Sequence, residues 1–159
     1  MTTSKLSTPA ELGRISEQMR AAGRVLVFTN GCFDLLHVGH TRYLQQARAM
    51  GDALVVAVNG DVSVRALKGP TRPINTEEER AEILSALSCV DHVVIFHEER
   101  VDAVIRAVKP QLYVKGGDYT IETLHPAEVA ALKETKSELR ILPLVPGKST
   151  TATLRRSQC

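Results

Sequence analysis

Apolar runs and amphipathic segments alternate along the chain, a pattern typical of a parallel sheet covered by helices on both faces. Short apolar runs predict strands at residues 25–29, 53–58, 93–96, 112–114 and 140–144. Helical spacing of apolar residues, with start and stop signals, predicts helices at 9–22, 38–50, 61–66, 76–88, 101–108 and 126–135, and a short one after Ser149. The pattern therefore predicts a single-domain, Rossmann-like doubly wound parallel sheet of about five strands.

Two of the expected helices begin with clear capping signals. Thr8 precedes Pro9 and Glu11, which suit the first and third positions of a helix that Gly23 would end. Residues 76–79, Thr-Glu-Glu-Glu, form a capping box for a second helix, whose inner face should be Ile83, Leu84 and Leu87. We expect residues 1–23 to be an N-terminal helical extension and residues 24–159 to be the main domain.

The most distinctive segment joins the first strand to its helix and contains His37, Gly39 and His40. A helix start presents free N–H groups and a partial positive charge, so it attracts anions. Both imidazoles lie on the first helical turn, where they could donate to the same phosphate, and glycine permits close approach of a ligand. The plainer alternative is a helix cap with a packing residue. A zinc site is disfavoured because no third ligand has suitable spacing.

Polar motifs also follow other predicted strands: residues 59–61 follow the second, 115–119 the fourth and 147–151 the fifth. Ligands of an open α/β sheet bind outside the carboxyl ends of its strands. Four segments that are distant in sequence should therefore meet at one edge of the sheet.

Composition excludes several classes of function. The formal charge is +2, aromatic residues make up 4 %, and tryptophan is absent, which argues against a nucleic-acid-binding surface. The three cysteines have no paired spacing, and neither a signal peptide nor an 18-residue apolar run is present. We therefore expect a cytoplasmic protein with no membrane association. Cys32 lies beside the candidate site, and an apolar filler is its simplest role.

Four segments carry a resemblance to a known family: residues 30–37, 58–69, 114–119 and 147–151. Together they resemble the cytidylyltransferase-like nucleotidyltransferase superfamily. The Lys-Gly-Gly-Asp-Tyr sequence at 115–119 and Ser-Thr-Thr at 149–151 are most similar to the bacterial heptose 1-phosphate adenylyltransferases. That resemblance implies transfer of AMP from ATP to D-glycero-β-D-manno-heptose 1-phosphate, which yields ADP-heptose and pyrophosphate. The cytidylyltransferases carry an arginine before their Ile-Ser-Thr, which is absent here, and Lys148 could replace it.

The resemblance and the residue chemistry together suggest three sets of site residues. The catalytic set is His37, His40 and Lys68. The nucleotide-binding set is Thr29, Asn30, Gly31, Cys32, Phe33, Asp34, Gly39, Lys115, Gly116, Asp118, Lys148, Ser149, Thr150 and Thr151. The substrate-binding set is Asn59, Asp61, Arg72, Arg80, Gly117 and Tyr119.

Several of these residues have a plainer alternative role. Lys68 and Arg72 fall on a predicted flexible loop between the second strand and the next helix, where they could simply be solvated charges; the resemblance favours Lys68. Asp34 could orient a histidine, contact phosphate or cap the turn. Arg80 could pair with Glu77 or with a phosphate. Asp118 could be a local cap, and Ser149 an ordinary N-cap that also begins an anion site.

The implied chemistry requires Mg²⁺, which we expect to arrive with ATP and not in a dedicated carboxylate site. Similar enzymes are usually dimeric or larger, so we expect a homo-oligomer. Two other functions stay open at this point. One is cytidylyl transfer to glycerol 3-phosphate or a related alcohol phosphate, and the other is a non-catalytic nucleotide-binding module.

Overall fold

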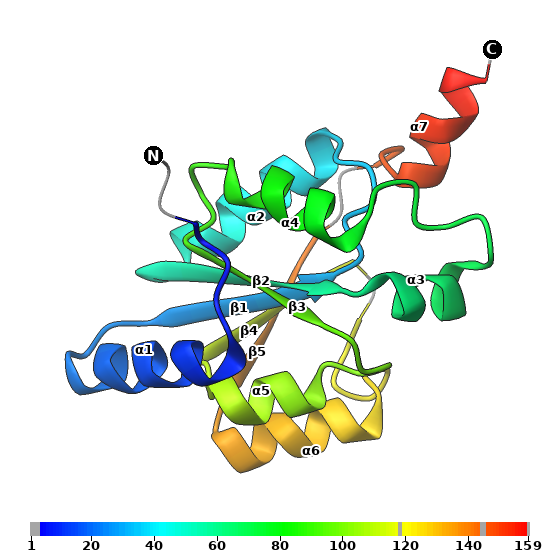
Figure 1. The fold of residues 1–159 in the computed structure, drawn as a ribbon. Coiled ribbons are helices and arrows are strands. Elements are labelled where there is room, and N and C mark those ends of the chain that lie inside the picture. Colours follow the sequence, from blue (N-terminus) through cyan, green and yellow to red (C-terminus); the bar gives the residue numbers. More distant parts are fainter. Residues whose placement is uncertain (1–3, 118, 144–145, 159) are drawn as a thin grey trace.

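The computed structural model describes residues 4–117, 119–143 and 146–158. Strands and helices alternate along the chain (Figure 1). The strands are β1 (Leu26–Gly31), β2 (Ala53–Asn59), β3 (His92–Phe96), β4 (Leu112–Gly116) and β5 (Glu138–Leu142). The helices are α1 (Pro9–Ala21), α2 (Val38–Ala49), α3 (Asp61–Lys68), α4 (Glu77–Ser85), α5 (Asp102–Val108), α6 (Pro126–Thr135) and α7 (Thr150–Ser157).

All five strands are parallel and lie in the order β3-β2-β1-β4-β5. Helices α2 and α4 cover one face, and α1, α5 and α6 cover the other (Figure 1). Alternate residues of β1 enter two separate cores: Leu26 and Phe28 pack toward α1 and α5, and Val27 packs toward α2. This arrangement confirms the predicted α/β fold, since a strand buried on both faces must be apolar at every position.

The strands and helices differ from the expected ranges in a few places. The fifth strand covers residues 138–142, two positions earlier than expected, and β1 extends to Gly31. Helix α3 is longer than expected and ends at Lys68. Both capping boxes are present, at Thr8 and at Thr76.

The main error of the sequence-based prediction is the set of residues expected on the inner face of α4. Ile83, which we expected inside, is 42 % exposed, whereas Arg80 is buried. A charged residue can take the inner position here because its polar partners lie at the ends of β1 and β2.

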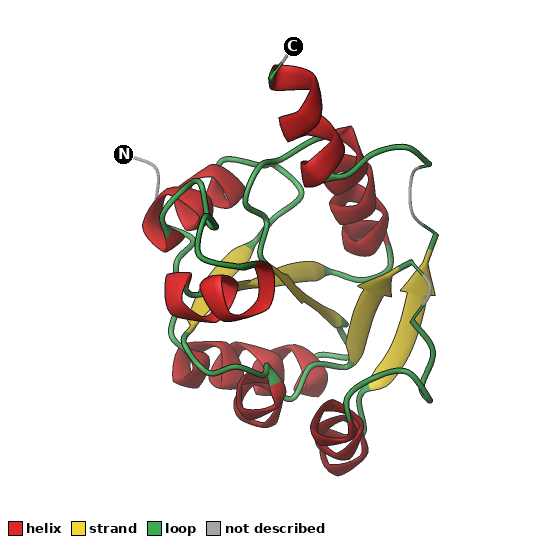
Figure 2. Cartoon of the chain, turned by 90° about the vertical axis from the view of Figure 1, so that its right-hand side faces the viewer, coloured by secondary structure: helices red, strands yellow, loops and turns green. Residues whose placement is uncertain are grey.

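The order in which strands are added to the sheet reverses at β1, because β2 and β3 lie on one side of it and β4 and β5 on the other. Ligands bind at such a switch point in doubly wound folds. Helix α1, in the segment expected as an extension, packs Leu12 and Met19 into the core. Helix α7 buries no residue and projects from the carboxyl edge near the start of α2 (Figure 2).

Candidate active site

A cavity of about 780 Å³ opens at the carboxyl ends of the strands. It brings together residues from four segments that are distant in sequence, as the motif positions predicted. The expected site residues that line it are Asn30, Gly31, Cys32, Phe33, Asp34, His37, Gly39, His40, Asn59, Lys68, Arg72, Lys115, Gly116, Tyr119, Lys148, Ser149, Thr150 and Thr151.

The two histidines of α2 hold each other in place through the backbone. His37 is the N-cap, and its Nδ1 accepts from the Gly39 N–H at 3.0 Å. The His37 N–H donates to Nδ1 of His40 at 3.3 Å, and the two ring centroids are 4.0 Å apart. Because each Nδ1 accepts a hydrogen bond, the proton of each neutral ring is on Nε2. Both rings therefore offer an Nε2–H donor.

The surroundings keep both rings neutral near pH 7. Burial, and then the charge of His37, lower the pKa of His40 to about 4. Burial also lowers the pKa of His37, as do the positive charges of Lys148 and Arg156. The pair therefore donates hydrogen bonds without carrying charge of its own.

Gly39 is required by close packing at the start of α2. A Cβ at this position would lie 2.7 Å from Cε1 of His37 and 3.3 Å from Cβ of Lys148. Any side chain would displace the His37 ring. Phe33 supports the other ring, since its centroid is 5.4 Å from that of His40. Phe33 has a φ of 48°, an uncommon backbone conformation for a bulky residue.

Helix α7 begins beside the histidines. Ser149 is its N-cap, and the Ser149 Oγ accepts from the Ala152 N–H at 3.0 Å. Thr150 Oγ1 donates to the Leu35 carbonyl at 3.3 Å, which ties α7 to the segment before α2. The N-termini of two helices thus face one cavity, and each favours negative charge.

Asp34 holds the segment between α3 and α4. Its carboxylate accepts from Arg72 Nε at 2.7 Å and from the Ile74 and Asn75 N–H groups at 2.9 and 3.0 Å. Burial would raise the pKa of Asp34, but these hydrogen bonds lower it overall. Of the three roles open to Asp34, this geometry favours the cap, since its described contacts go to this segment and not to a histidine.

Arg80 lies outside the cavity wall, although we expected it to bind substrate. Its side chain is fully buried. It donates to the carbonyls of Cys32, Asn59 and Asn75 at 2.7, 2.7 and 3.1 Å, and to Asp61 Oδ1 at 2.8 Å. Of the two partners considered for Arg80, Glu77 is not the one observed, because Asp61 is its carboxylate partner among the described residues. Arg80 joins the ends of β1 and β2 to α3 and α4.

Lys68 also lies in a different element from the one expected. It is the last residue of α3, whereas we expected the helix to end near residue 66 and Lys68 to begin the loop that follows. It still lines the cavity, and its side chain forms no ion pair with any described residue. Its exposed ammonium group can therefore reach a ligand.

Other expected residues have different surroundings. Thr29 is buried and donates to the Val114 carbonyl at 2.9 Å. Asn59 lines the cavity, but its Nδ2 donates to Ser63 Oγ at 2.9 Å. Gly117 and Asp61 do not line the cavity, and Asp118 lies outside the described residues.

The sequence analysis missed several lining residues. Among them, Arg42, Tyr43 and Gln46 recur on one side of α2. Thr123 and His125 come from the segment that leads into α6, and Glu128 from the first turn of that helix. Helical spacing could have revealed the first three, since they follow His40 on the same helix. No local signal marks Glu128.

Among the described residues, no group of three or more His, Cys, Asp or Glu side chains could hold a metal ion. Asp34 and Asp61 each accept from an arginine. The described side chains thus do not fit a resident metal. In the same part of the chain, no helix is both long and apolar enough to cross a membrane.

Comparison with known proteins gives consistent matches. Residues 28–155 match the cytidylyltransferase-like family. The chain is 47 % identical over 153 residues to the bifunctional protein HldE of Syntrophotalea carbinolica and 50 % identical over 153 residues to that of Hyphomonas neptunium. Each match covers 96 % of this chain and 31 % of the relative. The chain thus spans about a third of the length of these relatives.

Two solved structures share the architecture. The lipopolysaccharide core biosynthesis protein from Thermoplasma volcanium has a TM-score of 0.64 and 31 % identity, over 77 % of this chain and 98 % of that one. Pantoate-beta-alanine ligase from Francisella tularensis, at 12 % identity and a TM-score of 0.54, covers 87 % of this chain and 66 % of its own, and shares the fold alone. On the extent of the match and the identity to these relatives, the chain belongs to the cytidylyltransferase-like family.

Proposed function

We propose that this chain is a nucleotidyltransferase that transfers AMP from ATP to D-glycero-β-D-manno-heptose 1-phosphate, yielding ADP-heptose and pyrophosphate. The observation that carries the proposal is the paired histidine site. Two neutral imidazoles, whose Nε2–H groups donate to no described residue, line the same cavity as the start of α7. The resemblance of residues 114–119 and 147–151 to the heptose enzymes supplies the acceptor.

The reaction asks the protein mainly for positioning and for stabilisation of charge. An oxygen of the sugar phosphate attacks the α-phosphorus of ATP. A new P–O bond forms, the bond from the α-phosphorus to the bridging oxygen breaks, and pyrophosphate leaves with that electron pair. No proton transfer from a side chain is needed.

The histidines are suited to donate to α-phosphate oxygens as negative charge redistributes in the transition state. Neutral rings fixed by backbone hydrogen bonds need no reorganisation for this role. Lys148 and the start of α7 are suited to the β- and γ-phosphates. Lys68 and Arg72 also line the cavity and could neutralise the incoming phosphate.

We propose that Mg²⁺ is carried with ATP, where it would neutralise phosphate charge. No step of the mechanism is assigned to protein ligands of the metal. Cytoplasmic location and assembly into a homo-oligomer remain predictions from the sequence.

Pyrophosphate release tests the function directly. The purified chain should release pyrophosphate with ATP and the heptose 1-phosphate, and the sugar product should have the mass of ADP-heptose. Activity with CTP and glycerol 3-phosphate, and none with ATP, would instead establish the cytidylyltransferase alternative that the family name suggests. Nucleotide binding without turnover on any sugar phosphate would indicate a non-catalytic module.

A further inference from the structure

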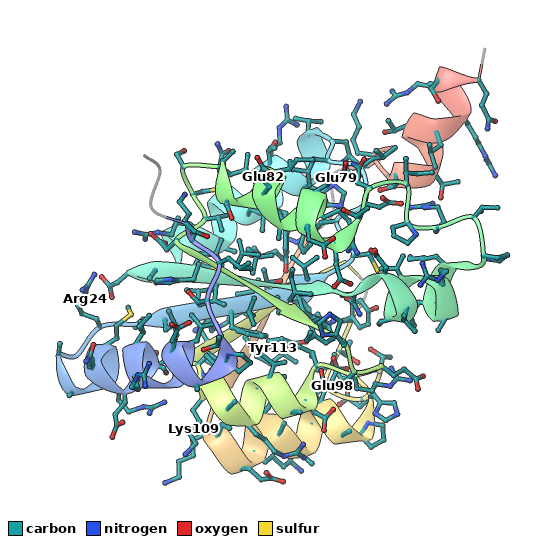
Figure 3. All side chains as sticks on the ribbon, in the orientation of Figure 1. Arg24, Glu79, Glu82, Glu98, Lys109 and Tyr113 are labelled. Carbon is teal, nitrogen blue, oxygen red and sulfur yellow. The ribbon has the colours of Figure 1, made fainter. Side chains whose placement is uncertain are left out.

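The floor of the cavity holds a cluster of polar side chains that the proposed phosphate chemistry does not use. Lys115 comes from the end of β4, Asn30 from the end of β1 and Glu128 from the first turn of α6. Tyr113 lies beneath them, between the sheet and helices α5 and α6 (Figure 3). Three elements therefore place their polar groups at one point.

The contacts hold Lys115 and Glu128 as a partly desolvated ion pair. Lys115 Nζ is 4.0 Å from Glu128 Oε1, and their side chains are only 13 % and 10 % exposed. The same ammonium lies 4.9 Å from the Tyr119 ring centroid and 5.7 Å from that of Tyr113. Burial lowers the pKa of Lys115, and the negative charge of Glu128 opposes this effect. The pair leaves the floor close to neutral.

Tyr113 fixes the orientation of the remaining groups. Its hydroxyl donates to Asn30 Oδ1 at 2.7 Å and lies 3.3 Å from Glu128 Oε1. With Oδ1 of Asn30 occupied, its Nδ2 is the free end, and it donates to no described residue. Glu128 Oε2 likewise accepts from no residue of the described chain. The cluster thus keeps an amide donor, an ammonium donor and a carboxylate acceptor for a ligand.

This set of groups suits sugar hydroxyls better than phosphate. A hydroxyl both donates and accepts, so neighbouring hydroxyls can donate to the carboxylate and accept from the ammonium or the amide. A phosphate would meet the negative charge of Glu128, whereas Lys148, which also lines the cavity, is exposed and forms no ion pair with a described residue. We propose that Asn30, Lys115 and Glu128 form a subsite for vicinal hydroxyl groups of a sugar, with Glu128 as its specificity-determining acceptor.

The subsite rests on the proposed function, which provides two sugars: the ribose of the nucleotide and the acceptor sugar. Both offer the same chemistry, and binding measurements distinguish them. In one arm, calorimetry compares ATP with 2′-deoxy-ATP and 3′-deoxy-ATP. In the other, it compares the heptose 1-phosphate with analogues that each lack one hydroxyl group, in the presence of a non-hydrolysable ATP analogue.

The decisive variant is Glu128→Gln, which keeps the shape of the side chain and removes its charge. Wild type should prefer one hydroxylated ligand to its deoxy analogue by about 10- to 100-fold, as expected for a hydrogen bond to a charged group. E128Q should lose most of that preference while binding the deoxy analogue about as well as wild type does. Lys115→Gln provides an independent variant and should reduce the same preference.

Glu134→Gln is the matched control. Glu134 lies on the same helix, is exposed and pairs with Arg106 away from the cavity, so E134Q should keep the wild-type preference. If E128Q loses the preference in the ATP arm, the ribose is the sugar bound at the subsite. If it loses the preference in the other arm, the acceptor sugar is the one bound there. Wild-type preferences retained by E128Q in both arms would overturn the subsite alone. Failure of the wild-type chain to bind ATP or any sugar phosphate would overturn the proposed function as well.

Discussion

The two sides of the cavity provide polar groups in different ways. Beside α2 and α7, backbone N–H groups orient two uncharged imidazoles, and cations such as Lys148 remain exposed. On the floor, Lys115 and Glu128 face each other with little access to solvent. The first arrangement suits a ligand that brings negative charge, and the second suits a ligand that is polar but uncharged. Under the proposed function, the phosphate groups and the hydroxyl groups of the ligands would therefore bind on different sides of the cavity.

The largest expected effect concerns Arg80, which joins the ends of β1 and β2 to α3 and α4. Arg80→Ala removes the donors of three carbonyl groups and the partner of Asp61. We expect the free energy of unfolding to fall by about 3–5 kcal/mol, as for other buried ion pairs that lose one member. Chemical denaturation measures this loss.

Arg80→Lys should not restore stability, because an ammonium group cannot replace the planar fork of the guanidinium. Arg65→Ala, an exposed change on α3, is the control and should stay within about 0.5 kcal/mol of wild type. If R80A were as stable as wild type, the hydrogen bonds of Arg80 would not stabilise the fold as we describe.

The next effect separates chemistry from binding on the phosphate side. His40→Ala should lower kcat by about 10²–10³-fold, the cost of losing one transition-state donor, and should leave the protein folded. Steady-state pyrophosphate release measures kcat. His97→Ala, which removes a largely exposed histidine outside the cavity lining, should change kcat by less than about twofold. A near-normal kcat in H40A would remove the imidazole from the mechanism.

Asp34→Asn probes the clamp on the segment between α3 and α4. The amide cannot accept all the hydrogen bonds of the carboxylate, so the variant should lose about 1.5–3 kcal/mol of unfolding free energy. Because the folded-state pKa of Asp34 is lowered, its contribution is present above the unfolded pKa of about 3.9 and is lost as pH falls through the folded value. Denaturation near neutral pH should therefore show the difference, which should shrink in acid. A constant difference would contradict the assignment.

The smallest effect tests the neutrality of His40. Its pKa is lowered to about 4, so the unfolded chain binds the proton more readily between about pH 4 and pH 6.5. The neutral His40 ring therefore contributes to the free energy of unfolding above about pH 6.5, and this contribution is lost as the pH falls toward 4. His40→Gln should remove roughly 1 kcal/mol of that pH dependence, given the partial screening by solvent. Identical pH profiles for the two proteins would show that His40 has an ordinary pKa.

Local signals predicted much of the fold and part of the site. The capping boxes at Thr8 and Thr76 depend on residues three positions apart, so the sequence reveals them directly. The convergence of the four motifs followed from parallel strands, whose carboxyl ends share one edge. The hydroxyls of α7 and the histidines of α2 accordingly line the same cavity.

Residues whose surroundings come from several elements could not be predicted in this way. Arg80 looked like a ligand residue because its partners Cys32, directly after β1, and Asn59, at the end of β2, lie far away in sequence. Glu128 carried no signal, since only the packing of α6 against β4 brings it to Lys115. The choice among the roles of Asp34 likewise needed the position of residues 72–75, some forty positions along the chain.

The most direct test of this division compares H40A and E128Q in one assay of pyrophosphate release from ATP and the heptose 1-phosphate. Our account predicts that H40A loses kcat with KM values close to wild type, and that E128Q raises one KM with kcat nearly unchanged. Equal losses of kcat in both variants, or absence of release by the wild-type chain, would contradict it.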